Sequence, residues 1–212
     1  GSSSSDITVN GGSVNAPEAI SAKFANISVT GGDYKGKIAV KNGSISGGTF
    51  DTLIDYRYLA DGYVLEEKPD GTYGLKEGKY VAVIGTVGYE SLQAAINAAA
   101  ENETVKLVAD TNENVTIEAG KNITLELNGF TLNGGTGTAK AAILNYGTVV
   151  IKDSSKAATG TIKRDDKGTV GETSYYVIRN LGTMTIESGN IENNSGYRQD
   201  NSTGTMIGSS LI

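Results

Sequence analysis

The chain has no cysteine, no histidine and no tryptophan among its 212 residues. Without cysteine there are no disulfides, thiolate metal sites or cysteine nucleophiles, and without histidine there are no serine–histidine triads. A secreted animal domain with a weak core would usually carry disulfides, so an exported bacterial protein fits better. Because the aromatic residues are 11 Tyr and 3 Phe, we expect an aliphatic core with tyrosines at its edges.

The chain also lacks long apolar runs and an excess of positive charge. No apolar stretch approaches the roughly 20 residues of a transmembrane helix, and no signal peptide is visible, so we expect no membrane insertion. The net charge of −6 and the scattered basic residues, whose densest run is Lys163-Arg164, argue against a nucleic-acid partner. The serine-rich opening, residues 1–5, has the composition of a linker, and we expect a fragment that is monomeric.

Glycine, by contrast, is abundant, with 29 residues against 2 prolines. Short β-branched segments are followed by glycine pairs in Ile7–Gly12, Ile27–Gly32 and Ser44–Gly48, and these pairs are 20 and then 16 residues apart. A longer segment, Asn145–Ile151, returns 35 residues later as Asn180–Ile186. Short strands that recur with glycine at their corners predict a chain wound into stacked coils.

The pattern predicts an all-β chain in two units. Residues 1–78 form a short unit of small strands that ends in a β-hairpin near 63–75, where Pro69-Asp70-Gly71 supplies the turn. We expect this hairpin to cover the open end of the coils. Residues 79–212 form a second unit that a capping α-helix opens near 91–100. This helix has one apolar stripe and an N-cap residue: Leu92, Ala95, Ile96 and Ala99, with Ser91 as the cap.

Two sets of segments resemble known proteins. Tyr89–Ala99, followed by Thr104–Leu107, resembles the capping helix and first coil of right-handed parallel β-helix proteins, the superfamily of pectate lyases and pectin methylesterases. Ile45–Phe50, Leu59–Tyr63 and Asn122–Gly129 resemble repeated units of large surface proteins of gut Firmicutes. The resemblance implies a right-handed single-stranded parallel β-helix, or solenoid, and an extracellular location on a bacterial cell surface.

The resemblance leaves three functions open. The first is a non-catalytic adhesin or stalk whose long face contacts host or dietary glycans. The second is a carbohydrate-active enzyme of the pectate-lyase-like fold, a polysaccharide lyase or a glycosidase. The third is a pure structural spacer. The sparse carboxylates, the lack of tryptophan and the repeats favour the first function, so we expect a protein that is not an enzyme.

Candidate catalytic residues come from the resemblance to lyases, in which acidic side chains bind calcium and an arginine or lysine abstracts a proton. The nearest equivalent is the run Lys163–Lys167, with Arg164, Asp165 and Asp166 as the candidates. The alternative for this run is a solvated loop between coils, whose mixed charges keep it soluble.

A calcium site is the alternative to a chain without cofactors. Asp110–Asn114 has oxygen ligands at alternate positions, as at the start of a calcium-binding loop. The match then fails, because Val115 stands where the pattern needs glycine and Lys121 where it needs glutamate. A turn after a strand explains the segment better, so we expect no metal and no other cofactor.

Four tyrosines are the candidate ligand-binding residues: Tyr146, Tyr175, Tyr176 and Tyr197. They fall near predicted strands of the second unit or in the loops between them. An exposed aromatic ring packs well against the C–H face of a sugar, so carbohydrate is the expected partner. The alternative is that these rings pack over coil edges and stabilise the stack.

Asparagines at the predicted corners have a structural interpretation: Asn128, Asn145, Asn180 and Asn190. Asparagine tolerates left-handed backbone and satisfies the amide groups of turns. Stacked coils would align such residues into ladders.

Overall fold

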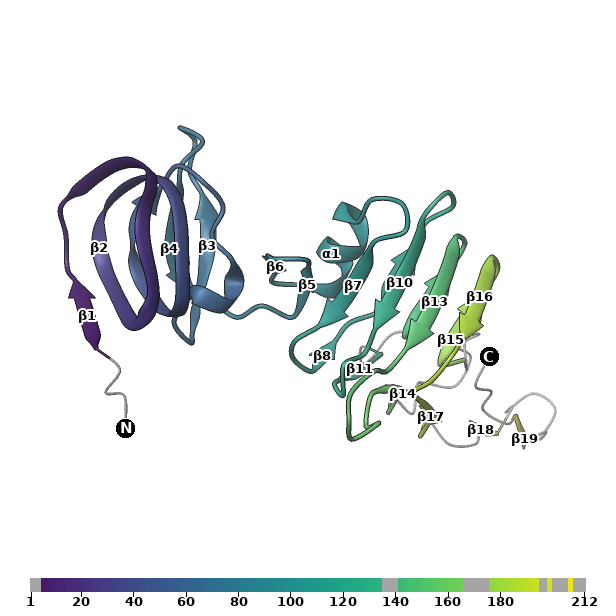
Figure 1. Cartoon of the computed structure of the whole chain (residues 1–212). Coiled ribbons are helices and arrows are strands. Elements are labelled where there is room, and N and C mark those ends of the chain that lie inside the picture. The colour runs from purple at the N-terminus through teal and green to yellow at the C-terminus, as the bar shows by residue number, and fades with distance from the viewer. Residues whose placement is uncertain (1–4, 135–140, 166–175, 195–197, 200–205, 208–212) are drawn as a thin grey trace. The chain divides into compact units, whose positions relative to one another are not determined.

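The computed structural model describes residues 5–134, 141–165, 176–194, 198–199 and 206–207. The chain divides into two compact units (Figure 1): unit 1 comprises Gly1–Tyr80 and Gly85–Glu90, and unit 2 comprises Val81–Ile84 and Ser91–Ile212. Nearly all regular structure is β-strand, with a single α-helix among the described residues. The predicted all-β class is therefore confirmed.

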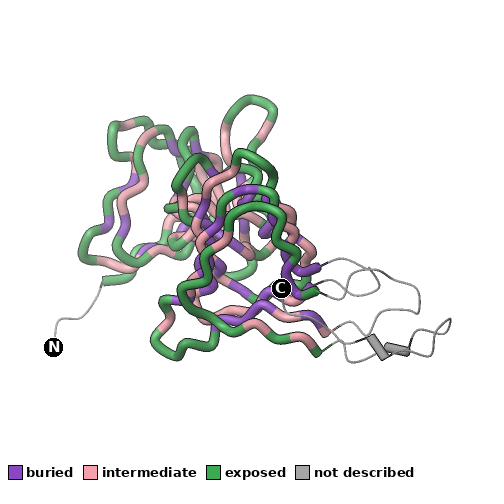
Figure 2. Tube along the Cα trace, turned by 90° about the vertical axis from the view of Figure 1, so that its right-hand side faces the viewer, coloured by how far each residue is buried: buried purple, intermediate pink, exposed green. Residues whose placement is uncertain are grey.

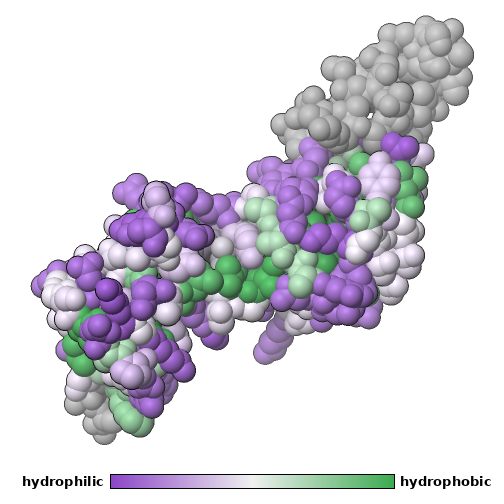
Figure 3. Space-filling view, turned by 90° about the horizontal axis from the view of Figure 1, so that it is seen from above, coloured by the Kyte–Doolittle hydropathy of each residue, from purple (hydrophilic) through white to green (hydrophobic). Residues whose placement is uncertain are grey.

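Burial recurs at short intervals along the chain in both units (Figure 2), as expected when strands turn alternate side chains inward. On the face seen in Figure 3, hydrophilic residues predominate over the described surface and apolar residues occupy smaller areas. In the part of the chain that the structure describes, no helix has the length and apolar character to cross a membrane.

Unit 1 is built around one long strand that winds through successive coils (Figure 1). β1 (Asp6–Val9) pairs in parallel with β2 (Ser13–Phe50), so that Val9 lies opposite Val29. The prediction of several small strands is wrong here, because β2 stays extended over 38 residues. The reason is that the chain turns its corners at glycines without leaving the extended conformation for more than a residue.

The predicted glycine corners are confirmed. Gly12, Gly32 and Gly48, the second members of the three glycine pairs, have φ of 100°, 112° and 117°, a region that favours glycine. Of the first members, Gly31 and Gly47 closely approach a neighbouring coil: a Cβ built on Gly47 would lie 2.2 Å from the carbonyl oxygen of Thr30. The second and third corners therefore need glycine for both conformation and space.

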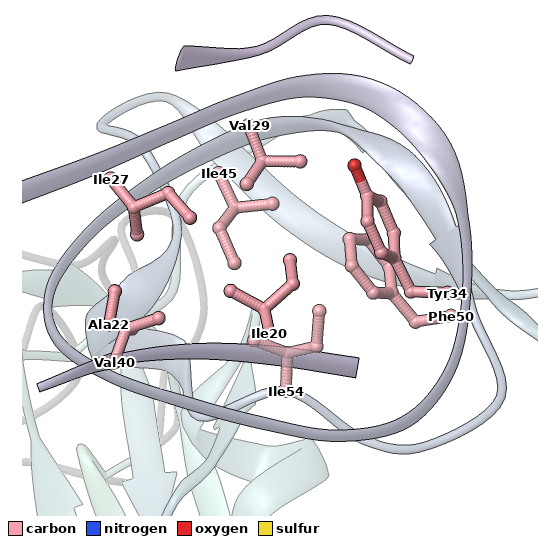
Figure 4. Close-up of a cluster of buried hydrophobic side chains, with 9 residues drawn as sticks. All are labelled: Ile20, Ala22, Ile27, Val29, Tyr34, Val40, Ile45, Phe50 and Ile54. Atoms are coloured by element: carbon pink, nitrogen blue, oxygen red, sulfur yellow. The ribbon is translucent and has the colours of Figure 1, made fainter. Parts of the chain in front are cut away.

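Nine buried residues in the interior of unit 1 form one apolar cluster (Figure 4). Tyr34 and Phe50 stack with their ring centroids 5.2 Å apart, and the Tyr34 hydroxyl donates to the carbonyl oxygen of Gly31 at 2.8 Å. The ring pair thus joins two coils of β2. The buried residues of the cluster are Ile20, Ala22, Ile27, Val29, Tyr34, Val40, Ile45, Phe50 and Ile54.

The predicted hairpin is confirmed as β3 (Tyr63–Glu67) and β4 (Tyr73–Glu77), which pair antiparallel. In its turn, Thr72 N–H donates to Asp70 Oδ1 at 3.0 Å. β4 also pairs with the end of β2, where Tyr73 lies opposite Phe50, and its side chains pack on the apolar cluster. The hairpin thus covers the last coil of β2. The 3₁₀ helix η1 (Tyr56–Tyr58) and β6 (Val87–Tyr89) complete unit 1.

In unit 2 the chain passes through three parallel sheets in turn, adding one strand to each (Figure 1). The first sheet contains β7 (Thr104–Leu107), β10 (Asn122–Glu126), β13 (Thr148–Lys152) and β16 (Thr183–Ile186). The second contains β8 (Thr111–Asn112), β11 (Thr131–Asn133), β14 (Thr161–Arg164) and β17 (Asn190–Asn193). The third contains β9 (Val115–Ile117), β12 (Ile143–Asn145) and β15 (Ile178–Asn180).

The register confirms the predicted repeat of 35 residues: Asn145 lies opposite Asn180 in the third sheet, and Ile151 opposite Ile186 in the first. Two pairings in unit 2 are antiparallel, those of β5 (Ala82–Ile84) with β7 and of β18 (Arg198–Gln199) with β19 (Met206–Ile207).

The predicted capping helix is confirmed as α1 (Leu92–Ala98). Ser91 is its N-cap, because the Ala94 N–H donates to the Ser91 Oγ at 3.0 Å. The apolar stripe is buried, with Ile96 only 1% exposed, and the helix packs against β5, β7 and β9. The apolar stripe of α1 therefore covers the first coil of unit 2.

We expect Ile96→Asp to lower the free energy of unfolding of unit 2 by about 4 kcal/mol, because it buries an unpaired charge. Ala94→Asp adds the same charge on the exposed face of α1, and we expect a cost below about 1 kcal/mol. Urea unfolding followed by circular dichroism measures both, and equal stability of the two variants would contradict the packing of α1.

We expect Gly47→Ala to destabilise unit 1 by about 2 to 3 kcal/mol, because the new methyl group meets the Thr30 carbonyl oxygen. Gly11 holds the same place in the first glycine pair but has open space around it, so Gly11→Ala should change stability by less than about 0.5 kcal/mol. Thermal melting of both variants tests the close approach of the coils. A Gly47→Ala variant with the melting temperature of the native chain would contradict this close approach.

Candidate functional site

The two candidate tyrosines that the structure describes flank strands of the third sheet of unit 2. Tyr146 directly follows β12 and is 44% exposed, while Tyr176 precedes β15 and is 38% exposed. Because Ile143 lies opposite Ile178, these rings stand at opposite ends of neighbouring strands. Tyr175 and Tyr197, the other two candidates, lie outside the described residues.

Tyr146 has an exposed apolar neighbour on the next coil. The Leu181 N–H donates to the Asn145 carbonyl oxygen at 2.7 Å, which places Leu181 beside Tyr146 across the sheet. Leu181 is 54% exposed, so the two side chains offer an aromatic and an aliphatic surface to solvent. Leu181 could not be identified from the sequence, because only the strand register makes it a neighbour of Tyr146.

A buried asparagine ladder supports this edge. Asn145 is fully buried, and its Nδ2 donates to the Asn180 Oδ1 at 2.7 Å on the next coil. Its Oδ1 accepts from the Gly147 N–H at 3.1 Å, so the same side chain holds the turn that carries Tyr146. The predicted asparagine ladder is confirmed for this pair, and Asn128 has the left-handed conformation expected at a corner, with φ of 50°.

The candidate catalytic residues take structural positions. Arg164 is 1% exposed inside β14, while Asp166 lies outside the described residues. Asp165 accepts hydrogen bonds from Lys163 at 2.7 Å and from the Asn194 amide at 2.8 Å. The interpretation of this run as a loop is wrong for Lys163 and Arg164, because β14 extends through both and turns Arg164 inward.

The ionisation of Lys163 and Asp165 also favours a structural role. The Lys163 ammonium, with the Asn194 amide, lowers the pKa of the Asp165 carboxyl, and the bond to Asp165 raises the pKa of Lys163. A general base that takes a proton near neutral pH needs the opposite change, a lowered pKa of the amine. Lys163 and Asp165 therefore form a partly exposed ion pair at the end of β14.

In the segment considered for calcium binding, the carboxylates of Asp110 and Glu113 accept hydrogen bonds from backbone N–H groups. Asp110 Oδ1 accepts from the Thr131 N–H at 2.8 Å. The Glu113 carboxylate accepts from the N–H groups of Leu92 at 2.9 Å and Gln93 at 3.2 Å, at the start of α1. Glu113 thus completes the capping of α1 from β8's loop, where a carboxylate also complements the helix dipole. Among the described residues, no three Asp or Glu side chains gather as a metal site would require.

Two buried carboxylates escaped the sequence analysis, and both hold the corner between the first and second sheets. Asp153 is 8% exposed and accepts from the N–H groups of Gly129 at 2.8 Å, Ser155 at 3.1 Å and Gly160 at 2.7 Å. Glu126 is 3% exposed and accepts from the N–H groups of Asn128 and Ser154, both at 2.9 Å.

Both carboxylates are held in the ionised form. Burial by itself would raise the pKa of Asp153, but the donors at Gly160, Ser155 and Gly129 outweigh burial and lower the pKa. Burial likewise opposes the effect of the Ser154 and Asn128 donors on the pKa of Glu126, and the donors again prevail. All carboxylate oxygens of Asp153 and Glu126 accept hydrogen bonds from residues of the turns. We call each ionised carboxylate, together with the turn residues that donate to it, a clamp.

A local signal for the Asp153 clamp exists in the sequence. Asp153-Ser154-Ser155 directly follows a β-branched strand, the composition of a side-chain-stabilised turn. The donors at Gly129 and Gly160 could not be identified this way, since one lies on the previous coil and the other beyond the loop.

Comparison of the chain with models of known protein families, with curated proteins and with solved structures found no match.

We expect Asp153→Asn to destabilise unit 2 by about 2 kcal/mol, because its amide nitrogen must face a backbone N–H whichever way it turns. Glu126→Gln removes the same charge, but its oxygen can keep both backbone donors while its nitrogen donates to the Ser154 hydroxyl. We therefore expect Glu126→Gln to cost less than half as much in urea unfolding. Equal costs would show that charge alone, and not the hydrogen-bond pattern, stabilises the corner.

The same pair fixes the sign of a pH dependence. Since the folded pKa values of Asp153 and Glu126 are lowered, their contribution to stability is present above the unfolded value of about 4 and is lost as the pH falls below it. Unfolding measured between about pH 5 and 3 should show this loss, and Asp153→Asn should flatten the curve.

Proposed function

We propose that the chain is a non-catalytic segment of a bacterial cell-surface protein, an adhesin or stalk that contacts glycans through side chains displayed on stacked coils. One observation carries the proposal: the buried polar side chains of unit 2 form hydrogen bonds that join one coil to the next. The resemblance of the chain to repeat segments of surface proteins supports the same location, extracellular on the cell.

The architecture that we propose is the right-handed, single-stranded parallel β-helix. In its support, the strands from β7 to β17 enter three sheets in a fixed rotation, and each strand from β10 onward pairs in parallel with its counterpart on the coil before it. Such a chain lengthens by whole coils, and each coil contacts only the coils before and after it. An elongated display surface follows from that geometry.

The hydrogen bonds of the buried polar side chains support a structural role over a catalytic one. Asn145 bonds across coils to Asn180, and Asp153 bonds to Gly129 on the previous coil. Glu126 accepts from Ser154 on the following coil. Each of these groups uses its acceptors in fixed contacts, whereas a catalytic carboxylate must keep an oxygen available to the reacting group.

Glycan contact is assigned to the exposed side chains at the ends of the third sheet. Tyr146 and Leu181 lie side by side on successive coils, whose strands are about 4.8 Å apart. A sugar ring presents a C–H face of similar size, which packs on an aromatic ring while its hydroxyl groups stay in water. Tyr176 offers a second ring at the other end of the same strands.

The experiment is affinity electrophoresis of the full chain through gels that hold xylan, mucin, pectin or glycosaminoglycans, at about 0.5 M NaCl, where ionic contacts are screened. We expect at least one glycan to retard the chain, and Tyr146→Ser and Tyr176→Ser each to reduce the retardation. Phe24→Ser is the matched control, because it removes a 93% exposed ring from unit 1.

Two outcomes would replace the proposal. If no glycan retards the chain, the function is that of a structural spacer. If incubation with a glycan releases reducing ends or unsaturated products, the chain is a carbohydrate-active enzyme of this architecture. Loss of retardation in Phe24→Ser but not in the tyrosine variants would move the contact to unit 1.

A further inference from the structure

Two adjoining hollows lie on the surface of unit 1, with volumes of about 300 and 340 Å³. Lys41 and Tyr58 line both of them. Lys23 and Lys37 line the first hollow, and Arg57 lines the second. Four cationic residues and one tyrosine thus line the two hollows.

These cations come from a locally basic part of an acidic protein. Between residues 19 and 50 the chain carries four lysines and a single acidic residue, Asp33. The basic residues are scattered along the sequence, but the winding of β2 brings Lys23 to the hollow of Lys37 and Lys41.

The three lysines of the first hollow differ from Arg57 in their ion pairing. Within the described residues, no carboxylate forms an ion pair with Lys23, Lys37 or Lys41. Arg57 differs, since it pairs with Asp55, the N-cap of η1. Asp55 therefore fixes the Arg57 side chain, whereas the three lysines remain available to an anion from outside.

One side-chain and one backbone hydrogen bond hold the segments around the hollows together. Asn42 Nδ2 donates to the Asn26 Oδ1 at 3.1 Å, which holds two coils of β2 together beside the lysines. The Ala60 N–H donates to the Ile45 carbonyl oxygen at 2.9 Å and thereby docks the end of η1 on β2. Gly43 leaves room for the tyrosine, since a Cβ there would lie 3.1 Å from the Tyr58 Cβ.

The lining combines apolar and cationic residues. Ile38, Ala39, Val40 and Tyr58 line the first hollow together with its lysines. A sugar residue that carries an anionic substituent has the complementary surface, a C–H face for the ring and an anion for the ammonium groups. A single-stranded nucleic acid would use several aromatic platforms for its bases, and the lining provides one.

We propose that these hollows bind an acidic polysaccharide, a chain of sugars that carries sulfate or carboxylate groups. The lysines contact the anionic groups, and Tyr58 packs against a sugar ring between them. The site lies in unit 1 and uses none of the residues assigned to glycan contact in unit 2, so either assignment can fail alone.

The test is calorimetric titration of the full chain with a heparin hexasaccharide and with a polygalacturonate oligomer of equal length, which separate sulfate from carboxylate recognition. We expect binding of at least one of them, with an affinity that falls on the order of tenfold between about 50 and 200 mM NaCl as counterions are released. The double variant Lys37→Gln/Lys41→Gln should weaken this binding by roughly tenfold.

The matched control is Lys79→Gln/Lys156→Gln, which removes the same charge at two exposed lysines outside the hollows. Unchanged affinity in this control, and in Tyr146→Ser, supports the site. Three results would overturn it: neither oligosaccharide binds, the control loses as much affinity as the test variant, or single-stranded DNA of equal charge binds equally well. Thermal melting of both double variants confirms that they remain folded.

Discussion

The structure depends on how closely one coil of backbone approaches the next at the corners. At these corners the carbonyl of one coil occupies the space where a side chain of the next would begin. A Cβ on Gly182 would lie 2.2 Å from the Gly147 carbonyl oxygen, and a Cβ on Gly147 would lie 2.6 Å from that of Glu118. The same relation joins Gly47 to Thr30 in unit 1. Because glycine alone permits this approach, the corner glycines set the register, and the register decides which side chains meet.

Side chains that meet across coils then stabilise the stack according to their chemistry. Aliphatic positions form continuous ladders, as Val105, Leu125 and Ile151 do in the first sheet. Polar positions inside the stack need partners at the same spacing, and Asn145 finds one in Asn180. A buried amide or carboxylate without such a partner would cost several kcal/mol, so each polar position also selects the correct register over a shifted one.

Features that depend on a few neighbouring residues could be predicted from the sequence. Contacts that depend on which distant segment lies alongside could not. The glycine corners, the capping of α1 by Ser91 and the hairpin turn at Asp70 all follow from segments of a few residues. The burial of Arg164 and the clamp at Asp153 depend on which segment returns beside them. Aligned positions in the first sheet lie 20, 26 and 35 residues apart, so no single period relates them. For the same reason, the opposite placement of the two described tyrosines and the gathering of lysines in unit 1 emerge only from the fold.

The Asp153 clamp has a further consequence for how this chain can vary. Its carboxylate accepts from Ser155 and Gly160 together, so both ends of the loop between them are tied to one side chain. In a chain without cysteine, this arrangement is a non-covalent counterpart of a disulfide-closed loop. Since closing a loop costs little more as the loop grows, residues inserted after Lys156 would leave the ladder of coils undisturbed. This loop is thus a suitable position for inserting foreign peptide sequences. Protonation of Asp153 in acid would weaken the hydrogen bonds that hold the two ends of the loop.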